Sequence, residues 1–344
     1  MKIVIGILIF CFIVFFHELG HFLMAKLNHI RVNEFSIGFG PKLLHLKKGE
    51  TEYCLKLIPF GGSCMMEGEL EDSDDPNAFI NAGVWARIAV VLGGPVFNFI
   101  LAFILSVIMI FLSGVDRPMI NQITEGYPAQ MAGLKPGDEI VKLDNFRTYF
   151  FRDVSAYIAT HDGEPLEITY KRNGEEYVAF VKPIFNEEAN RYYVGITNTE
   201  GYTKISGLSV LKYSYCEVRY WIYSTLQSIK MIGQGRVKAE DLSGPVGIVE
   251  VVGDTYDQAA SFGAMVILVN MLNIAVLLSA NLGVMNLLPI PALDGGRFLL
   301  LFIEAIIRKK LPEKMEATIN GIGLMLLFGL MIFVMGNDIR KIFM

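Results

Sequence analysis

The chain has 344 residues, of which 53% are hydrophobic, with a formal net charge of −5 and a mean hydropathy of +0.43. This composition is too apolar for an ordinary soluble protein, and it indicates several membrane spans with a polar insert. The modest negative charge gives no basis for nucleic-acid binding. The four cysteines lack CxxC spacing, so they indicate neither a disulfide framework nor a thiolate zinc site.

The first predicted element is a transmembrane helix at about 3–25, an apolar run whose only charged or imidazole side chains are His17, Glu18 and His21. The run is longer than the hydrophobic region of a typical signal peptide, and no small-residue cleavage site follows it. We therefore expect the helix to be retained. Ionisable side chains at membrane depth cost about 2.5–3.5 kcal/mol each and are seldom kept without a function.

These three residues have the spacing of a zinc site. Residues four apart lie on one face of a helix, about 6 Å apart along its axis, so His17 and His21 can bind one metal ion. Glu18 lies about 100° round the turn, where it can reach a water on the metal rather than the metal itself. Two histidine ligands and a general base form the zincin arrangement. The alternative is a pair of hydrogen-bonded core histidines, which the charge-free surroundings disfavour.

A mixed, glycine-rich segment follows the first span. Residues 43–46 and 53–57 have the pattern of short strands across a Lys-Gly-Glu turn, which predicts a membrane-associated β-hairpin loop at about 33–63. Such a hairpin could dip back toward the histidines, and its unpaired edge could take up an extended peptide as an extra strand. A surface loop with turn glycines is the alternative. We interpret the acidic run 67–75 as a solvated loop.

The second predicted span runs from about 88 to 112 and closes the first part of the membrane domain, residues 1–113. It contains the sequence Gly-Gly-Pro-Val-Phe-Asn at 93–98. The glycines permit close helix approach, and Asn98 must find a partner inside the bundle. Ordinary small-residue packing and a role in shaping the site both remain open for this segment.

Residues 114–205 have the character of a soluble domain. A short helix, a tight turn and a strand are predicted over 127–141, a helix over 153–159, and a hairpin about the Asn-Gly dipeptide at 173–174. With the run AGLKPGD at 132–138, these residues resemble a PDZ domain, a module that binds peptides by strand addition. A purely steric role over the membrane is the alternative.

Residues 206–260 are predicted to hold an amphipathic helix, at 208–232, followed by a linker. Apolar and aromatic residues recur there at helical spacing, but several charges interrupt them. The helix is too polar to span, so we expect it to lie at the membrane interface.

The second part of the membrane domain covers residues 261–344. Its third span, at about 261–307, is broken at membrane depth by Pro289 and Pro291 and by the glycines that follow. Broken backbone is tolerated at that depth only where it is buried or lines a cavity. The fourth span is predicted at about 317–335. The fold class is therefore a polytopic α-helical membrane protein with four transmembrane helices and an inserted PDZ-like α+β domain.

Lysine and arginine positions predict the orientation of the chain, because such residues gather in cytoplasmic loops. Two loops carry them, between spans one and two and between spans three and four: Lys26, Arg31, Lys42, Lys47, Lys48, Lys56, Arg87, Arg308, Lys309, Lys310 and Lys314. Both loops are thus expected in the cytoplasm. The PDZ-like domain and both termini are then expected outside, in a multi-pass protein of the inner or plasma membrane.

A catalytic zinc needs a third protein ligand and an open position. Met24 and Leu27 stand where a metzincin would need glycine and histidine, and Glu34, at the spacing of a thermolysin-like ligand, lies beyond the span. The remaining histidines are His29, His45 and His161. Asp294 is the better candidate, because it ends a charge-free span within broken helix, where an unpaired carboxylate would be costly. The first and third spans both run toward the cytoplasm, so His21 and Asp294 can both lie toward the cytoplasmic side.

Taken together, these motifs resemble the site-2 protease family, peptidase M50, and within it the bacterial RIP zinc metalloproteases of the regulator of sigma-E protease type. The resemblance rests on HELGH at 17–21, GPxxN at 94–98, the PDZ-like insert and the segment 286–295, and it covers essentially the whole chain. Better-known members carry two PDZ domains, whereas this chain has room for one.

The resemblance implies the roles of individual residues. Zinc would be bound by His17, His21 and Asp294, and Glu18 would be the base. Asn286 is similar to the asparagine of the family that supports substrate or transition state. Further supporting positions are Asn98, Pro289 and Pro291.

The implied activity is hydrolysis of peptide bonds inside the membrane, within single-span substrates such as trimmed anti-sigma factors or signal-peptide remnants. Two alternative hypotheses are a membrane metal-ion transporter and a catalytically inactive relative that only binds membrane helices. A single HExxH motif and the scarcity of further intramembrane acids disfavour the transporter. The intact Glu18 and all three ligands disfavour the inactive relative.

Overall fold

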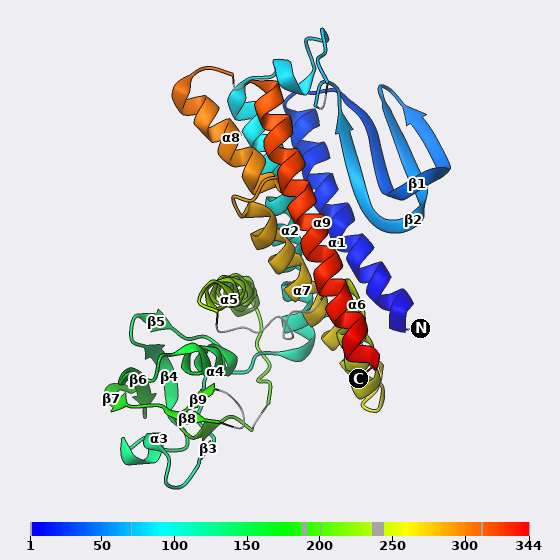
Figure 1. The fold of residues 1–344 in the computed structure, drawn as a ribbon. Helices are drawn as coiled ribbons and strands as arrows, with labels where there is room; N and C mark the ends of the chain where they lie inside the picture. The colour runs from blue at the N-terminus through cyan, green and yellow to red at the C-terminus, as the bar shows by residue number, and fades with distance from the viewer. Residues whose placement is uncertain are drawn as a thin grey trace. The chain divides into compact units, whose positions relative to one another are not determined.

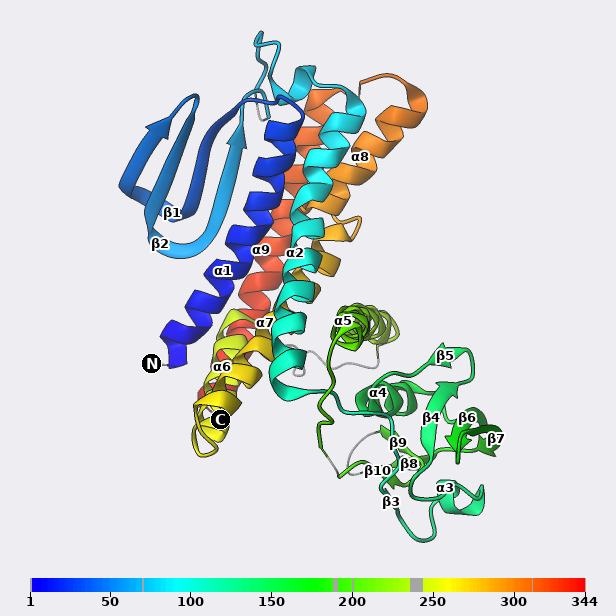
Figure 2. The same ribbon diagram turned by 180° about the vertical axis from the view of Figure 1, so that it is seen from behind.

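The computed structural model describes residues 2–69, 71–187, 191–199, 201–235, 244–310 and 312–343. The chain forms two compact units, one made of Met1–Leu105 with Ser228–Met344 and the other of Ser106–Gln227. Figures 1 and 2 show the elements of each from opposite sides. Each unit is described by itself.

Among the residues that the structure describes, four helices are long and apolar enough to cross a membrane. The α-helices of the chain are α1 Lys2–Leu27, α2 Val84–Ser113, α3 Pro128–Met131, α4 Phe151–Thr160, α5 Leu208–Gly233, α6 Pro245–Ala260, α7 Ala264–Leu287, α8 Asp294–Ile307 and α9 Glu313–Phe343. The candidate spans lie in α1, α2, α7 and α9; they are 21 to 30 residues long, and each contains an 18-residue stretch with a mean hydropathy between 2.0 and 2.6. About 20 apolar residues suffice to cross a bilayer, so the coarse prediction of a four-helix membrane protein is confirmed.

The strands are β1 Val32–Lys48, β2 Thr51–Met66, β3 Gln122–Ile123, β4 Glu139–Leu143, β5 Phe146–Arg147, β6 Leu166–Arg172, β7 Glu175–Val181, β8 Ile184–Asn186, β9 Arg191–Tyr193 and β10 Ile196–Thr197, and a 3-10 turn covers Phe79–Asn81. The hairpin occupies about the range expected from sequence, 33–63, but β1 and β2 are longer than the short strands expected at 43–46 and 53–57. Both bend, so that residues 34–37 lie between 62–65 on one side and 52–55 on the other, while 44–48 pair with 51–55.

The small sheet formed by β1 and β2 lies beside α1 (Figure 1), and aromatic rings pack between the two. The ring of Phe35 lies 5.9 Å from Phe15 and 5.0 Å from Phe22 of α1, and Tyr53 lies 6.0 Å from Phe22. Edge-to-face aromatic contacts of this kind add to the burial of the rings themselves. Farther along the sheet, apolar side chains are exposed: Phe39, Leu43, Leu44, Leu46, Leu57 and Ile58.

One sequence expectation needs correction within the first unit. The part of 206–260 taken as a linker contains the 16-residue helix α6, which packs against α1, α7 and α9. Its first turn is capped from another helix, because the carboxylate of Asp338 in α9 accepts hydrogen bonds from the backbone N–H groups of Gly244 and Gly247, both at 2.9 Å. A cap supplied from a distant helix leaves no local signal, which explains why the sequence predicted a linker in place of this helix.

Two ion pairs lie on one face of α8. Glu304 makes a buried bidentate pair with Arg87, at the start of α2. Two turns earlier, Arg297 binds Glu69 at 2.5 Å, and its guanidinium lies over the ring of Phe79. The acidic run at 67–75 is therefore not simply a solvated loop, because Glu69 pairs with the helix that begins at Asp294.

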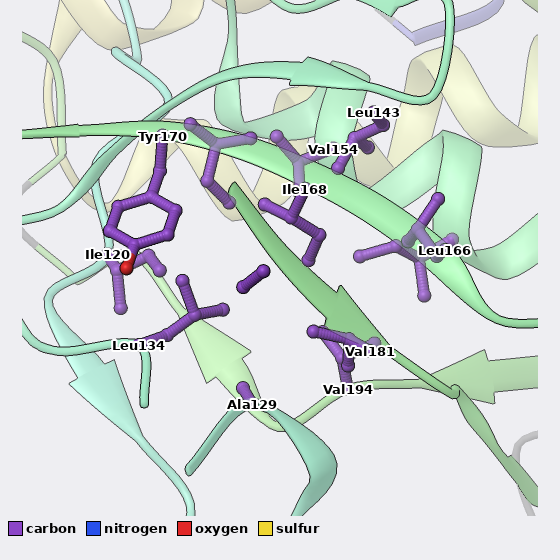
Figure 3. Close-up of a cluster of buried hydrophobic side chains, with 13 residues drawn as sticks. Ile120, Ala129, Leu134, Leu143, Val154, Leu166, Ile168, Tyr170, Val181 and Val194 are labelled. Atoms are coloured by element: carbon purple, nitrogen blue, oxygen red, sulfur yellow. The ribbon is translucent and has the colours of Figure 1, made fainter. Parts of the chain in front are cut away.

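The second unit is built on the antiparallel sheet β5-β4-β6-β7, with α3 and α4 beside it. The hairpin β6–β7 turns at Asn173 and Gly174, both with positive φ, as the sequence predicted. Its core is apolar (Figure 3), and its labelled members are Ile120, Ala129, Leu134, Leu143, Val154, Leu166, Ile168, Tyr170, Val181 and Val194.

The helix α5 belongs to this second unit, and a buried ion pair attaches it. Glu217 is fully buried and contacts Arg152, while the indole N–H of Trp221 donates to the same carboxylate at 2.9 Å. Burial raises the pKa of Glu217, although Arg152 beside it acts in the opposite direction. The opposite face of α5 exposes apolar residues, Leu208, Leu211, Tyr215 and Leu226, so α5 is amphipathic and its polar face is occupied by the domain.

The pair Arg87–Glu304 predicts a stability effect that depends on which partner is removed. Arg87→Met leaves a buried carboxylate unpaired and should lower the free energy of unfolding by about 3–5 kcal/mol. The double substitution Arg87→Met with Glu304→Met removes both charges and should cost clearly less. Thermal unfolding in detergent measures both. Arg117→Met, in the half-exposed pair with Glu139, is the control and should cost under about 1 kcal/mol. A double variant as unstable as the single one would contradict the argument.

Candidate metal centre

Three atoms with lone pairs converge between α1 and α8. The Nε2 atoms of His17 and His21 lie 3.2 Å apart, and the Oδ2 atom of Asp294 lies 3.2 Å from the first and 3.5 Å from the second. The side chains are at most 16% exposed. The structure therefore brings together the three residues that the sequence proposed as ligands.

The triangle has the size that zinc requires. Ligand atoms about 2.0–2.1 Å from a tetrahedral zinc ion lie about 3.3–3.4 Å from one another, close to the three observed separations. The Oδ2 atom of Asp294 is buried and, apart from the two imidazole nitrogens, has no hydrogen-bond partner among the described residues. A buried carboxylate oxygen facing two imidazole lone pairs needs a cation beside it. Two histidines and one carboxylate also leave a fourth position open, as in catalytic zinc sites.

Hydrogen bonds on the far side of each imidazole ring orient the ligands. His21 Nδ1 donates to the carbonyl of Val90 at 2.9 Å, which leaves its Nε2 lone pair facing the site. His17 Nδ1 lies 3.1 Å from the amide of Asn98, whose Oδ1 is buried without a partner. Rotating that amide by 180° lets Oδ1 accept the Nδ1 proton, which satisfies both groups. Asn98 is thus a partner of His17 rather than a lining residue of the open position.

Glycines allow α1 and α2 to approach each other at this level. A Cβ atom on Gly20 would lie 2.6 Å from the carbonyl carbon of Gly93, and one on Gly94 would lie 2.6 Å from Cε1 of His17 and closer still to Nε2 of His21. The sequence left open whether the pair at 93–94 serves packing or the site. The structure shows both: Gly93 meets the backbone of α1, and Gly94 leaves room for the imidazoles.

Glu18 lies beside the ligands and against β2. A Cβ atom on Gly62 would lie 3.0 Å from Cγ of Glu18, so the last part of β2 passes alongside this carboxylate. Glu18 therefore follows the ligand His17 directly in α1 and packs against an extended strand. This is the arrangement that a general base needs if its substrate is an extended peptide.

The remaining predicted residues lie at different distances from the triangle. The amide Nδ2 of Asn286, at the end of α7, is 3.4 Å from His17 Nε2. Pro289 and Pro291 belong to the connection between α7 and α8, and Pro291 contacts Gly323 of α9 rather than the ligands.

Sequence reasoning missed several residues that support the site. Ser279 of α7 donates to the backbone carbonyl of Asn98 at 2.8 Å, and Asn320 of α9 accepts from the backbone of Ala292 at 3.3 Å. Each acts across helices that are far apart in the chain. The only available signal was the presence of a polar residue within an apolar span.

Comparisons with known proteins agree with this geometry. The model of the family described as Peptidase family M50 matches residues 5–330. The chain belongs to peptidase family M50. A Clostridium acetobutylicum protein named as a zinc metalloprotease is 39% identical over 98% of this chain and 97% of its own length. The Regulator of sigma-W protease RasP of Bacillus subtilis is 31% identical, and the Zinc metalloprotease RasP of Geobacillus kaustophilus is 30% identical, each over at least 98% of both chains.

The family predicted from sequence is thereby confirmed, and with it the enzyme class, a zinc-dependent metallopeptidase, at the level of the family. Among solved structures, the PDZ domain of an SdrC-like protein from Listeria monocytogenes matches 25% of this chain and 86% of its own, with 23% identity and a TM-score of 0.22.

The close contact of Gly94 with both imidazoles predicts that adding a single methyl group at this position weakens metal binding. Gly94→Ala should displace both imidazoles and reduce bound zinc in the purified protein by at least about tenfold, because outer contacts of ligands alone are worth 10–100-fold in affinity. Gly329→Ala is the matched control, since a Cβ atom there has no neighbour within 4 Å. Equal zinc content in the two variants would show that Gly94 does not set the ligand geometry.

Proposed function

We propose that this chain is an intramembrane zinc endopeptidase that hydrolyses peptide bonds within the transmembrane segments of single-span proteins. The observation that supports it most directly is the ligand triangle of zinc-like dimensions, with Glu18 beside it, on helices apolar enough to cross a membrane. Membership of a peptidase family supplies the reaction class. The proposed roles are metal ligand for His17, His21 and Asp294 and general base for Glu18.

The reaction needs a polarised carbonyl and an activated water. Zinc, when bound, would supply Lewis acidity for both. Glu18 takes the proton from the attacking water and hands it to the leaving amine. Asn98 and the carbonyl of Val90 keep the two imidazoles oriented throughout. The amide Nδ2 of Asn286 lies 3.4 Å from His17 Nε2, and in this proposal its N–H group stabilises the negative charge that develops on the substrate carbonyl oxygen.

The substrate must be extended at the bond that is cut, because a helix buries its own peptide groups. Residues 62–65 of β2 pair with 34–37, and within the described residues they have no partner on their other edge. Since Gly62 lies against Glu18, this edge is the one that we assign to the substrate strand. Addition of a strand would align the peptide backbone beside the base.

The substrate class follows from the relatives and from the second unit. The Bacillus subtilis relative is named a regulator of sigma-W protease, so trimmed anti-sigma factors are the first candidates, and signal-peptide remnants the second. The unit formed by Ser106–Gln227 would exclude substrates with large outer domains. It is proposed to lie outside the cytoplasm with both termini, and the basic loops inside.

No observation favours a metal transporter. Among the residues that the structure describes, the other group with metal-binding side chains is Glu34, Glu52 and Cys54. Lys42 contacts Glu34 at 2.7 Å and Glu52 at 2.6 Å, and Lys56 contacts Glu34 at 2.7 Å. Because lysine ammonium groups already neutralise these two carboxylates, this group of residues does not form a second metal site.

The role of Glu18 is tested by Glu18→Gln, which keeps the shape of the side chain and removes its basicity. Purified protein should retain zinc, while cleavage of a single-span substrate in liposomes should fall by at least about 10²-fold. Removal of zinc with a chelator should abolish cleavage by the wild type, and added zinc should restore it. Cleavage unaffected by the substitution would sink the proposal, whereas zinc flux without cleavage would favour a transporter.

The proposed sidedness is tested by labelling. In a background without the four native cysteines, Glu175→Cys and Lys309→Cys each place one exposed thiol. An impermeant maleimide added to intact cells should label the first, and it should label the second only after lysis. The reverse pattern would invert the topology.

A further inference from the structure

The backbone just before Asp294 makes an unusual turn. The N–H of Leu293 donates to the carbonyl of Ile290 at 3.2 Å, with Pro291 in the second position, and Ala292 in the third position has φ of 71°. A proline followed by a residue with positive φ defines a type II turn. This turn leads directly into α8, whose first residue is Asp294.

Alanine does not suit the third position of this turn. A type II turn requires positive φ there, which glycine or asparagine adopts easily, whereas an L-residue with a Cβ atom pays about 1–2 kcal/mol. The same four residues could form a type I turn, in which the peptide between Pro291 and Ala292 is rotated by about half a turn and alanine is unstrained. A tertiary contact must therefore favour the observed orientation of this peptide.

The contact comes from α9. The Oδ1 atom of Asn320 accepts a hydrogen bond from the N–H of Ala292 at 3.3 Å. One turn along the same helix, Gly323 makes room for the turn, because a Cβ atom there would lie 2.5 Å from the carbonyl oxygen of Pro291. In a type I turn the N–H of Ala292 would face away from Asn320. The hydrogen bond thus selects the type II form.

Close packing couples the orientation of the Pro291–Ala292 peptide to the position of Asp294. A Cβ atom on Gly296 would lie 2.8 Å from the carbonyl carbon of Ile290 and 3.0 Å from Cα of Pro291, so the first turn of α8 packs directly on the type II turn. A rotated peptide would have to move that first turn, and Asp294 with it.

We propose that Asn320 is a positioning residue for Asp294, which it serves by holding the Pro291–Ala292 peptide in the type II orientation. The inference rests on the proposed function only in taking Asp294 as a zinc ligand. It assigns to the fourth span a role in the geometry of a site to which that span contributes no ligand.

The test is the zinc affinity of the purified full-length protein, measured by competition with a chelator. Asn320→Ala should weaken zinc binding about tenfold, the low end of the effect of groups that orient ligands. Asn320→Asp keeps the acceptor oxygen and should stay within about threefold of the wild type. Ala292→Gly, which adopts positive φ without strain, should restore most of the affinity when combined with Asn320→Ala.

Asn270→Ala is the matched control, because the amide of Asn270 donates within its own helix, to the carbonyl of Val266 at 2.9 Å. Its zinc affinity should equal that of the wild type. Unchanged affinity in Asn320→Ala, or a loss that Ala292→Gly does not repair, overturns the inference. Either result leaves the proposed function standing if Glu18→Gln binds zinc but has lost cleavage. A wild-type protein that binds no zinc overturns both.

Discussion

The structure of the first unit depends on three buried ligand atoms whose lone pairs lie this close only when a cation or a proton is shared between them. The Nε2 atoms of His17 and His21 and the Oδ2 atom of Asp294 lie 3.2–3.5 Å apart, where water does not screen their repulsion. Helix α1 supplies two of these atoms from successive turns, whereas α8 supplies the third from the far end of the chain. The main task of the fold is therefore to bring the start of α8 to the middle of α1 and to keep it there.

Close backbone approach makes this possible. Gly20 and Gly94 let α1 and α2 meet at the level of the imidazoles, and Gly296 lets α8 begin directly against the turn that precedes it. In a bilayer, where apolar surface gains little from leaving lipid, such contacts and interhelical hydrogen bonds supply the specificity that a hydrophobic core supplies in water. Buried charge contributes as well, because Glu304 pairs with Arg87 on the face of α8 that meets α2.

In the proposed function, the sheet beside α1 and the second unit act on the substrate rather than on the metal. Within the described residues, the part of β2 at 62–65 has no strand on its other edge and lies against Glu18, so in the proposed function this element would align both the peptide and the base. In the second unit, the buried pair of Arg152 and Glu217 makes α5 part of the domain, and the exposed apolar face of α5 suits a membrane surface. In the proposed screening of substrates, the domain and α5 would therefore act together.

Local pattern was enough to identify the four spans, the imidazole pair with Glu18, and the family, because helical spacing and apolar length are properties of short segments. Asp294 could also be predicted as a ligand, since a carboxylate in a charge-free span is costly unless it has a binding partner. Contacts between residues distant in the chain could not be predicted from the sequence. They include the cap that Asp338 gives to α6, the ion pair of Glu69 with Arg297, and the hydrogen bond of Asn320 to Ala292. The sequence by itself determined which chemical groups the protein has at membrane depth. Only the tertiary structure decided how they are oriented, because orientation depends on hydrogen bonds and close packing between helices that no local pattern encodes.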